Sequence, residues 1–165
     1  MSKIIIYTDG ASRGNPGPGG WGAVVISENE VKELGGREDK TTNNKMELTA
    51  IIEALKYVSW PFPIVVYSDS EYAIKGMTEW IHGWQKRNWK NSQKKNVMNR
   101  DLWEKLLAVS SLKKIEWKHV RGHEDNPGNI RCDEIATMCA DNENPNLYSG
   151  SKDKYPFTDI VNNVL

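Results

Sequence analysis

Two short and almost unbroken apolar runs dominate the hydrophobic pattern of the chain. Residues 3–8 contain three consecutive isoleucines and a tyrosine, and residues 64–67 read Ile-Val-Val-Tyr. Runs of this length are typical of strands that are buried on both faces in the middle of a sheet. Residues 21–27 and 30–38 predict two further strands, joined by short turns in an antiparallel meander. Residues 114–120 alternate between apolar and polar positions and predict a fifth strand.

Apolar residues at helical spacing predict helices between and after these strands. The first runs from about residue 43 to residue 58, and its apolar face consists of Met46, Ala50, Ile51, Ala54, Leu55 and Val58. A short helix is expected near Ser70, a longer one over residues 101–112, and a last one from about Asn129. Strands that alternate with helices indicate an α/β fold.

At 165 residues the chain is expected to form one domain. We place this domain at residues 1–142, with residues 143–165 as a partly docked C-terminal tail. No stretch approaches the length of a membrane span, and no signal segment precedes the first strand, so an intracellular protein without a membrane partner is expected. Cys132 and Cys139 are predicted to be reduced core residues, because they lie about 10 Å apart along one predicted helix.

The net charge of zero conceals a strong asymmetry along the chain. Residues 75–100 carry seven basic side chains and one acidic side chain. Three tryptophans are interleaved with these cations, which suits a surface that contacts a phosphate backbone and stacks on sugars or bases. The alternative is a solvated helical pair with its tryptophans packed inside, and both interpretations can hold together.

Four acidic residues stand at the ends or near the starts of the predicted elements. Asp9 and Asp69 follow the two buried strands, whereas Glu47 and Asp133 lie near the starts of two helices. Sites in α/β sheets lie outside the carboxyl ends of the strands, so we expect the first two to lie close together. A carboxylate at the end of a buried strand is costly to desolvate unless a cation compensates its charge.

Each acid also has a purely structural interpretation. Asp9–Gly10 is a common turn dipeptide, and Asp69 suits the cap of the following helix. Glu47 stands at capping-box spacing from Asn44, and Asp133 in a first helical turn would favour the helix dipole. If the four converge instead, they stay ionised together only with cations present. Hard oxygen donors without clustered cysteine or histidine favour Mg²⁺ or Mn²⁺.

Short motifs follow one another at compatible spacing over about residues 3–140. They are Tyr7-Thr8-Asp9-Gly10, Gly14-Asn15-Pro16-Gly17, Thr42-Asn43-Asn44 leading through Met46 to Glu47-Leu48, Tyr67-Ser68-Asp69-Ser70, Asn99 before Asp101-Leu102-Trp103, Val120-Arg121-Gly122-His123, and Asn129-Ile130-Arg131-Cys132-Asp133. In this order they resemble the bacterial kind of type 1 ribonuclease H. The resemblance implies a ribonuclease H-like fold, with a mixed five-stranded sheet of order 3-2-1-4-5 flanked by helices and a basic handle at about residues 75–100.

The resemblance implies an enzyme that hydrolyses the RNA strand of RNA·DNA hybrids and leaves 5′-phosphate and 3′-hydroxyl ends. Two Mg²⁺ ions, replaceable by Mn²⁺, would be bridged by Asp9, with Asp133 on the nucleophile side and Glu47 and Asp69 on the leaving-group side. His123, on a loop flanked by glycines, would move protons and assist product release. Its alternative is a solvent-exposed histidine drawn to a negative pocket. His82 and His119 receive no role.

Hybrid recognition would involve the minor groove and one DNA phosphate. Similarity to the family assigns the groove contacts to Asn15, Asn43 and Asn44, and the phosphate site to Thr42 and Asn99, with Lys40 assisting. In the handle, the expected substrate-binding residues are Trp80, Trp84, Lys86, Arg87, Lys94 and Lys95.

Glu71 departs from the family pattern. Bacterial relatives usually carry glutamine at this position, so an acid is expected to weaken hybrid binding or to crowd the metal site. Two alternatives to the enzyme remain open: a non-catalytic module that binds RNA·DNA hybrids, and another nuclease of the same fold, such as an integrase or a Holliday-junction resolvase. A monomer located in the cytoplasm is expected.

Overall fold

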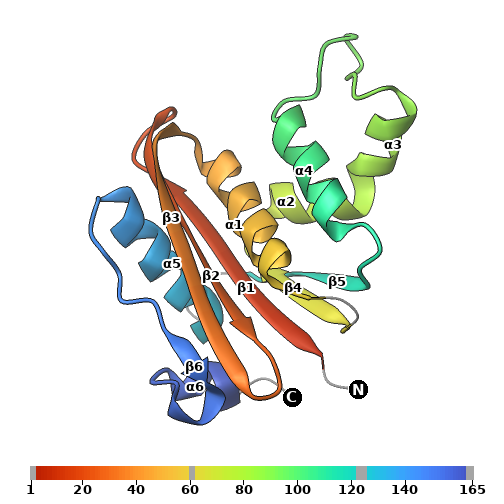
Figure 1. Cartoon of the computed structure of the whole chain (residues 1–165). Coiled ribbons are helices and arrows are strands. Elements are labelled where there is room, and N and C mark those ends of the chain that lie inside the picture. The colour runs from red at the N-terminus through yellow and green to blue at the C-terminus, as the bar shows by residue number, and fades with distance from the viewer. Residues whose placement is uncertain (1–2, 60–61, 122–125, 163–165) are drawn as a thin grey trace.

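The computed structural model describes residues 3–59, 62–121 and 126–162. In this part of the chain, one mixed sheet has the strand order β5-β4-β1-β2-β3-β6 (Figure 1). Its strands are β1 (Ile4–Ser12), β2 (Gly17–Ile26), β3 (Glu30–Thr41), β4 (Ile64–Ser68), β5 (Ile115–His119) and β6 (Ser149–Ser151). The five-strand order expected from the family resemblance is confirmed, and β1–β2–β3 form the predicted antiparallel meander.

The sixth strand corrects the expected count of five. β6 comes from the C-terminal tail and pairs antiparallel with the outer edge of β3, with Val31 opposite Gly150. Its sequence, Ser-Gly-Ser, has no apolar alternation, so hydrophobic periodicity could not reveal it. The pairing covers an edge strand whose backbone groups would otherwise face solvent.

The side chains of β1 alternate between two apolar cores, which explains its three consecutive isoleucines. Ile4 and Ile6 pack with the residues of the first helix on one face of the sheet. Ile5 and Tyr7 pack on the other face with Cys132 of the last long helix. All four β1 side chains are buried, which confirms the prediction of a strand covered on both sides.

Helices cover the two faces unequally, as Figure 1 shows. On the described residues they are α1 (Asn43–Tyr57), α2 (Glu71–Lys75), the π-helical turn η1 (Gly76–Trp80), α3 (Ile81–Lys86), α4 (Arg100–Ser110), α5 (Pro127–Ala140), the 3₁₀ turn η2 (Lys152–Lys154) and α6 (Thr158–Asn162). α1 contacts β1, β2 and α4, whereas α5 lies on β1, β2 and β3. The predicted apolar face of α1 is entirely buried, and both cysteines are buried and unbridged, as expected.

The basic handle projects from the body between α2 and α4 (green, Figure 1). Its tryptophans pack inward: Trp84 contacts the rings of Trp80, Trp89 and Trp103 with centroid distances of 5.1–6.3 Å. Trp103 lies directly over Gly76, where a Cβ atom would come within 1.9 Å of the indole ring. The tryptophans therefore extend the apolar core on the α1 face of the sheet beneath the exposed cations of the handle.

Candidate active site

Parallel strand pairing brings the first two predicted acids together. β1 and β4 run side by side, and Thr8 is the register partner of Ser68. The next residues along the chain are Asp9, within β1, and Asp69, directly after β4, at the carboxyl edge where sites in α/β sheets form. Asp69 does not cap the following helix, because the N-cap of α2 is Ser70, whose Oγ accepts a hydrogen bond from the Ala73 N–H at 3.1 Å.

Asp9–Gly10 is not a turn, which corrects the simplest structural interpretation of that dipeptide. β1 continues to Ser12 and stays paired with β2 beyond this point. Gly10 is needed because α1 crosses there: a Cβ atom on Gly10 would lie 2.4 Å from the backbone nitrogen of Glu47. The glycine therefore lets α1 approach until Glu47 meets Asp9 over the strand.

Glu47 does not belong to a capping box either. The N-cap of α1 is Thr42, whose Oγ1 accepts a hydrogen bond from the Lys45 N–H at 3.2 Å. Glu47 is thus the fifth residue of the helix rather than the third, so its carboxylate does not reach back to the cap. It faces the sheet and is only 5% exposed.

Asp133 reaches the same pocket from the opposite face of the sheet. α5 begins at Pro127, two residues earlier than expected, with Asn126 as its N-cap. Asp133 therefore lies in the second turn, where the helix dipole contributes little, so the dipole does not account for this residue. A pocket of about 500 Å³ is lined by all four predicted carboxylates together with Asn43, Asn44 and Glu71, among other residues.

The carboxylates of Asp9, Glu47 and Asp69 form the tightest part of this pocket. Each offers an oxygen atom, and these atoms lie within 4.8 Å of one another. Asp9 is 3% exposed, and its Oδ1 accepts a hydrogen bond from the Gly10 N–H at 2.8 Å. Asp69 and Asp133 are half-buried.

Burial and mutual repulsion perturb the acids of this cluster. Burial is the main cause that raises the pKa of Asp9 to about 7. A hydrogen bond with Glu47 opposes that rise, and the negative charges of Asp69 and Asp133 add to it. Burial, followed by the charge of Asp9 and a hydrogen bond with it, raises the pKa of Glu47 well above its ordinary value. Both acids are thus harder to ionise than usual, and bound protons or an added cation would relieve the repulsion between them.

The donor set fits a divalent metal ion. Three carboxylates converge from separate elements, a fourth lines the same pocket, and Oε1 of Glu47 is buried without a hydrogen-bond partner among the described residues. Hard oxygen donors of this kind suit Mg²⁺ or Mn²⁺ rather than zinc. Asp9, Glu47 and Asp69, with Asp133, are the residues that would hold the metal.

The predicted substrate contacts are only partly gathered at the pocket. Asn43 and Asn44, in the first turn of α1, are exposed and line it. Asn15 lies exposed in the β1–β2 loop, before the cis peptide bond to Pro16. The hydroxyl of Thr42 is already engaged as the N-cap of α1. Asn99 donates a hydrogen bond to the Tyr72 hydroxyl at 3.1 Å, and Tyr72 lines the pocket.

The predicted handle residues differ in how freely they can meet a ligand. The four cations lie on the exposed surface, whereas Trp84 is half-buried in the aromatic cluster and Trp80 is 37% exposed; the cations are Lys86, Arg87, Lys94 and Lys95. Substrate contact by these side chains stays a prediction. His123 lies outside the described residues.

Sequence reasoning missed two side chains that position the site. His119 Nε2 lies 3.2 Å from the backbone oxygen of Asp69. The buried Asn129 donates from Nδ2 to the backbone oxygen of Thr8 at 3.2 Å, which ties α5 to β1 beside Asp9. Both partners are backbone carbonyls, so the sequence does not indicate these contacts, although Asn129 begins the last of the family motifs. Glu71, the departure from the family pattern, forms an ion pair with Lys75 at 2.8 Å on the pocket rim.

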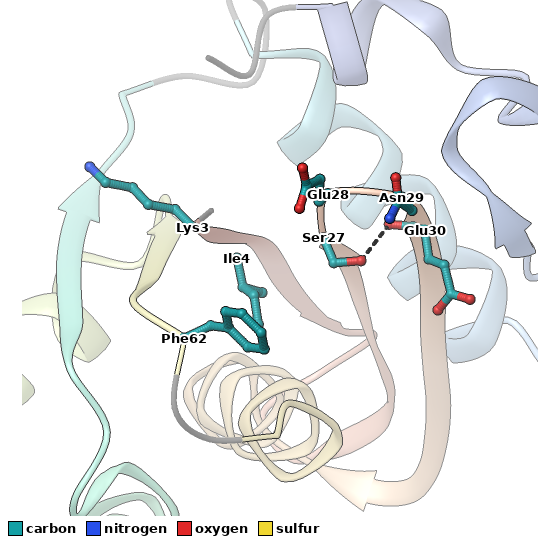
Figure 2. Close-up of a pocket in the computed structure, with 7 residues that line it drawn as sticks. All are labelled: Lys3, Ile4, Ser27, Glu28, Asn29, Glu30 and Phe62. Atoms are coloured by element: carbon teal, nitrogen blue, oxygen red, sulfur yellow. Dashed lines mark hydrogen bonds between the residues drawn. The ribbon is translucent and has the colours of Figure 1, made fainter. Parts of the chain in front are cut away.

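A second hollow, of about 340 Å³, lies at the amino end of β1. Figure 2 shows its lining residues, Lys3, Ile4, Ser27, Glu28, Asn29, Glu30 and Phe62. Ile4 and Phe62 supply the apolar wall, and the polar residues at the rim come largely from the β2–β3 turn. Because the converging carboxylates lie at the other end of β1, the acidic pocket is the candidate active site.

Comparison with known proteins identifies the family of the chain. A ribonuclease H of Geotalea uraniireducens is 53% identical over 134 residues, which cover 81% of this chain and 91% of the relative. A ribonuclease H of Herminiimonas arsenicoxydans is 49% identical over 146 residues, or 88% of this chain and all of the relative.

Solved structures and the family profile complete the assignment. The fold matches LC9-RNase H1, described as a type 1 RNase H with the type 2 active-site motif, with a TM-score of 0.81, 26% identity and coverage of 96% of this chain and 80% of that chain. LC11-RNase H1, solved in complex with an RNA/DNA hybrid, matches with a TM-score of 0.66, 25% identity and coverage of 85% and 98%. The RNase H profile matches residues 1–141. The chain therefore belongs to the RNase H family.

Proposed function

We propose that this protein is an endonuclease that hydrolyses the RNA strand of RNA·DNA hybrids. One observation carries the proposal: four carboxylates, from β1, α1, the residue after β4, and α5, line a single pocket in a chain of the RNase H family; they are Asp9, Glu47, Asp69 and Asp133. Two relatives that are 53% and 49% identical to this chain are ribonucleases H. The structural neighbour LC11-RNase H1 was solved in complex with an RNA/DNA hybrid.

The family uses divalent metal ions, and the acidic cluster supplies suitable ligands. We propose Mg²⁺ as the metal, bound as two ions and replaceable by Mn²⁺, with Asp9, Glu47, Asp69 and Asp133 as ligands. When bound, such ions lower the pKa of a water and stabilise the charge that develops on the leaving 3′ oxygen. Hydrolysis in this way would leave 5′-phosphate and 3′-hydroxyl ends.

The side chains around the acids would choose the substrate. Asn43 and Asn44 stand exposed at the pocket rim, where amides can read the 2′-hydroxyls and base edges of a minor groove. The exposed cations of the handle would contact backbone phosphates beyond the pocket. Glu71 adds a negative charge at the rim and would weaken hybrid binding, although its ion pair with Lys75 offsets part of that charge.

Three further assignments rest on the sequence and on the family. His123 would move protons at the site and assist product release, and a His123→Ala variant with lower kcat would support this. A monomer and a cytoplasmic location stay predictions, which light scattering and cell fractionation check. Among the described residues, none of the helices is long and apolar enough to cross a membrane.

Labelled duplexes test the proposed function directly. The full-length protein is incubated with RNA·DNA, RNA·RNA and DNA·DNA duplexes of one sequence, with and without Mg²⁺, and the products are resolved by length and end chemistry. We expect internal cuts in the RNA strand of the hybrid, only with metal. Binding of the hybrid without cleavage, at any Mg²⁺ or Mn²⁺ concentration, would point to a non-catalytic binding module. Cleavage of the DNA·DNA duplex instead would point to another nuclease of this fold.

A further inference from the structure

A buried ion pair lies on the side of α5 that faces away from the acidic pocket. Arg131 donates from Nε to Glu33 Oε2 at 2.7 Å and from Nη2 to Glu33 Oε1 at 2.9 Å. The two side chains are 8% and 0% exposed. Arg131 precedes Asp133 by two residues, so the two side chains project about 200° apart around the helix. The family motif explains Asp133, but nothing in the proposed mechanism uses the ion pair.

The C-terminal tail supplies most of the remaining partners of this pair, and Glu134 of α5 accepts one further hydrogen bond from Arg131 Nη1. The Tyr148 N–H donates to Glu33 Oε1 at 2.9 Å, and the Tyr155 hydroxyl donates to Glu33 Oε2 at 2.7 Å. Arg131 Nη2 also donates to the backbone oxygen of Asn146 at 3.1 Å, and its guanidinium lies 4.5 Å from the Phe157 ring centroid. A buried ion pair is stable only when additional hydrogen bonds satisfy its remaining groups, and the tail provides most of them.

Asp133 is the one proposed ligand whose position depends on α5. Asp9 and Glu47 belong to β1 and α1, Asp69 directly follows β4, and their oxygens already lie within 4.8 Å of one another. Asp133 lines the same pocket but stands outside that group of three. A carboxylate about 6 Å from a helix axis moves about 1 Å for each 10° of helix rotation. Shifts of this size are enough to impair a catalytic site.

The packing of α5 on the sheet restricts its distance from the strands. A Cβ atom on Gly22 would lie 2.6 Å from the Cys132 oxygen, and one on Gly35 would lie 2.6 Å from Ile135 Cγ2. The hydrogen bond from Asn129 to Thr8 fixes the start of the helix. A bidentate pair on the side of α5 opposite Asp133 adds a direct restraint on rotation about the helix axis.

We infer that the C-terminal tail sets the orientation of α5, so that Glu33, Arg131 and Tyr155 are positioning residues for the metal ligand Asp133. The inference rests on the proposed function for the role of Asp133 and goes beyond it in giving the tail a task. Tail contacts would then influence metal binding at a site they do not touch. In metal sites, partners beyond the direct ligands commonly change affinity by about 10–100-fold.

Paired tyrosine variants test the inference with Mn²⁺ as the probe. Tyr155→Phe removes the hydroxyl that reaches Glu33 and keeps the ring. Tyr148→Phe is the matched control, because its hydroxyl bonds only within the tail, to the Ser151 oxygen, while its ring packs on Tyr155 at 5.1 Å. Mn²⁺ is titrated into each variant, and the concentration of free Mn²⁺ is measured by electron paramagnetic resonance. We expect Tyr155→Phe to weaken Mn²⁺ binding about threefold or more, and Tyr148→Phe to leave it unchanged.

An Asp133→Asn background separates positioning from general destabilisation. If the tail acts through Asp133, Tyr155→Phe has no further effect on Mn²⁺ binding in that background. In hybrid cleavage at subsaturating Mg²⁺, the variant should lower kcat and leave KM for the hybrid unchanged. A second variant, Glu33→Gln, should give a larger effect in the same direction.

Two results would overturn the inference: equal Mn²⁺ affinities for the two tyrosine variants, or an effect of Tyr155→Phe that persists in Asp133→Asn. If Glu33→Gln does not fold, the tyrosine pair decides alone. Wild-type protein that binds Mn²⁺ but leaves hybrids intact would reject the proposed function, while the titrations would still decide the role of the tail.

Discussion

Two buried carboxylates in this protein, Glu33 and Asp9, have opposite electrostatic surroundings. Glu33 is fully buried, and burial acts to raise its pKa, but hydrogen bonds from Arg131, the Tyr148 N–H and Tyr155 outweigh burial and lower the pKa below its usual value. Asp9 is almost as buried, but the charges that act on it are those of acids, and burial raises its pKa to about 7. The residue types are similar, so the difference lies in what the fold places beside them.

The two sites differ in whether the fold itself compensates the buried negative charge. At Glu33 the chain itself supplies a countercharge and three hydrogen-bond donors, which makes the site complete and inert. At Asp9 the chain gathers further acids and leaves the charge to be balanced from outside. Incomplete compensation of this kind is costly to stability, and it marks a site built to take up a cation.

The strongest test of the comparison removes the charge at Asp9. Asp9→Asn should lower hybrid cleavage by about a thousandfold or more, since a lost ligand is worth several kcal/mol of transition-state stabilisation. The same change should raise the Tm of the metal-free protein, because it removes a repelled buried charge. Cleavage assays and thermal unfolding in a chelator measure the two effects. Unchanged turnover would remove Asp9 from the metal site.

Removing a charge at the Glu33 site should destabilise the protein, whereas removing the charge of Asp9 should stabilise it. Arg131→Met leaves Glu33 as an uncompensated buried charge and should reduce the free energy of unfolding by about 3–5 kcal/mol. Adding Glu33→Leu removes that charge, so the double variant should be more stable than Arg131→Met alone. Urea unfolding followed by circular dichroism measures both. A double variant less stable than the single one would show that the pair stabilises through more than mutual compensation.

The stabilisation of the folded protein by Mg²⁺ should increase with pH, because Asp9 has a raised pKa. Its folded pKa of about 7 lies above the ordinary value of 3.8, so the native state binds the extra proton. This contribution to stability is present below about pH 4 and is lost as pH rises to 7, where metal binding replaces it. At a hundredfold excess over Kd, Mg²⁺ should add about 2.7 kcal/mol, or roughly 5–10 °C in Tm, at pH 8 and much less at pH 5.

Thermal unfolding with and without Mg²⁺ at the two pH values measures this difference. Asp9→Asn is the control, and its Tm should respond to Mg²⁺ weakly at both. An equal Mg²⁺ shift at pH 5 and pH 8 in the wild-type protein would contradict the assignment of the raised pKa to the metal site.

The smallest expected effect concerns the handle, whose cations face solvent rather than buried acids. Neutralising its four exposed cations should weaken hybrid binding and reduce the slope of log Kd against log salt by up to about 0.9 for each phosphate that is no longer neutralised; the cations are Lys86, Arg87, Lys94 and Lys95. Binding is measured in the Asp9→Asn background, so that the RNA strand stays intact.

A matched variant controls for net charge. It neutralises four lysines outside both the handle and the acidic pocket, which are Lys3, Lys56, Lys152 and Lys154. Its salt slope should equal that of the parent protein. Equal slopes for the two quadruple variants would remove the handle from the hybrid interface.

Much of the fold could be predicted because burial imposes its own periodicity. The isoleucine run of β1 and the Ile-Val-Val-Tyr run of β4 can be satisfied only by strands covered on both faces, and the helical spacing of α1 is equally direct. β6 escaped prediction because backbone pairing alone defines a strand of serine and glycine.

For the site, the four acids could be identified from the sequence, but the details around them could not. Thr42 rather than Asn44 caps α1, and Ser70 rather than Asp69 caps α2. Propensity permits either choice in each case, and the packing of the helix onto the sheet decides between them. Glu47 and Asp69 therefore do not have the capping roles that their positions in the sequence suggested.

Local hydrophobic pattern and short motifs are sufficient to predict the strands and helices, the family and the four carboxylates. Three other features depend on the folded chain: Gly10 lies within a strand under α1, Asn129 binds the Thr8 carbonyl, and the tail closes over Glu33 and Arg131. Those contacts join residues up to 122 positions apart, and several end on backbone atoms that every residue possesses. No local pattern encodes such a partner, so the difference between a compensated and an uncompensated buried acid appears only once the chain is folded.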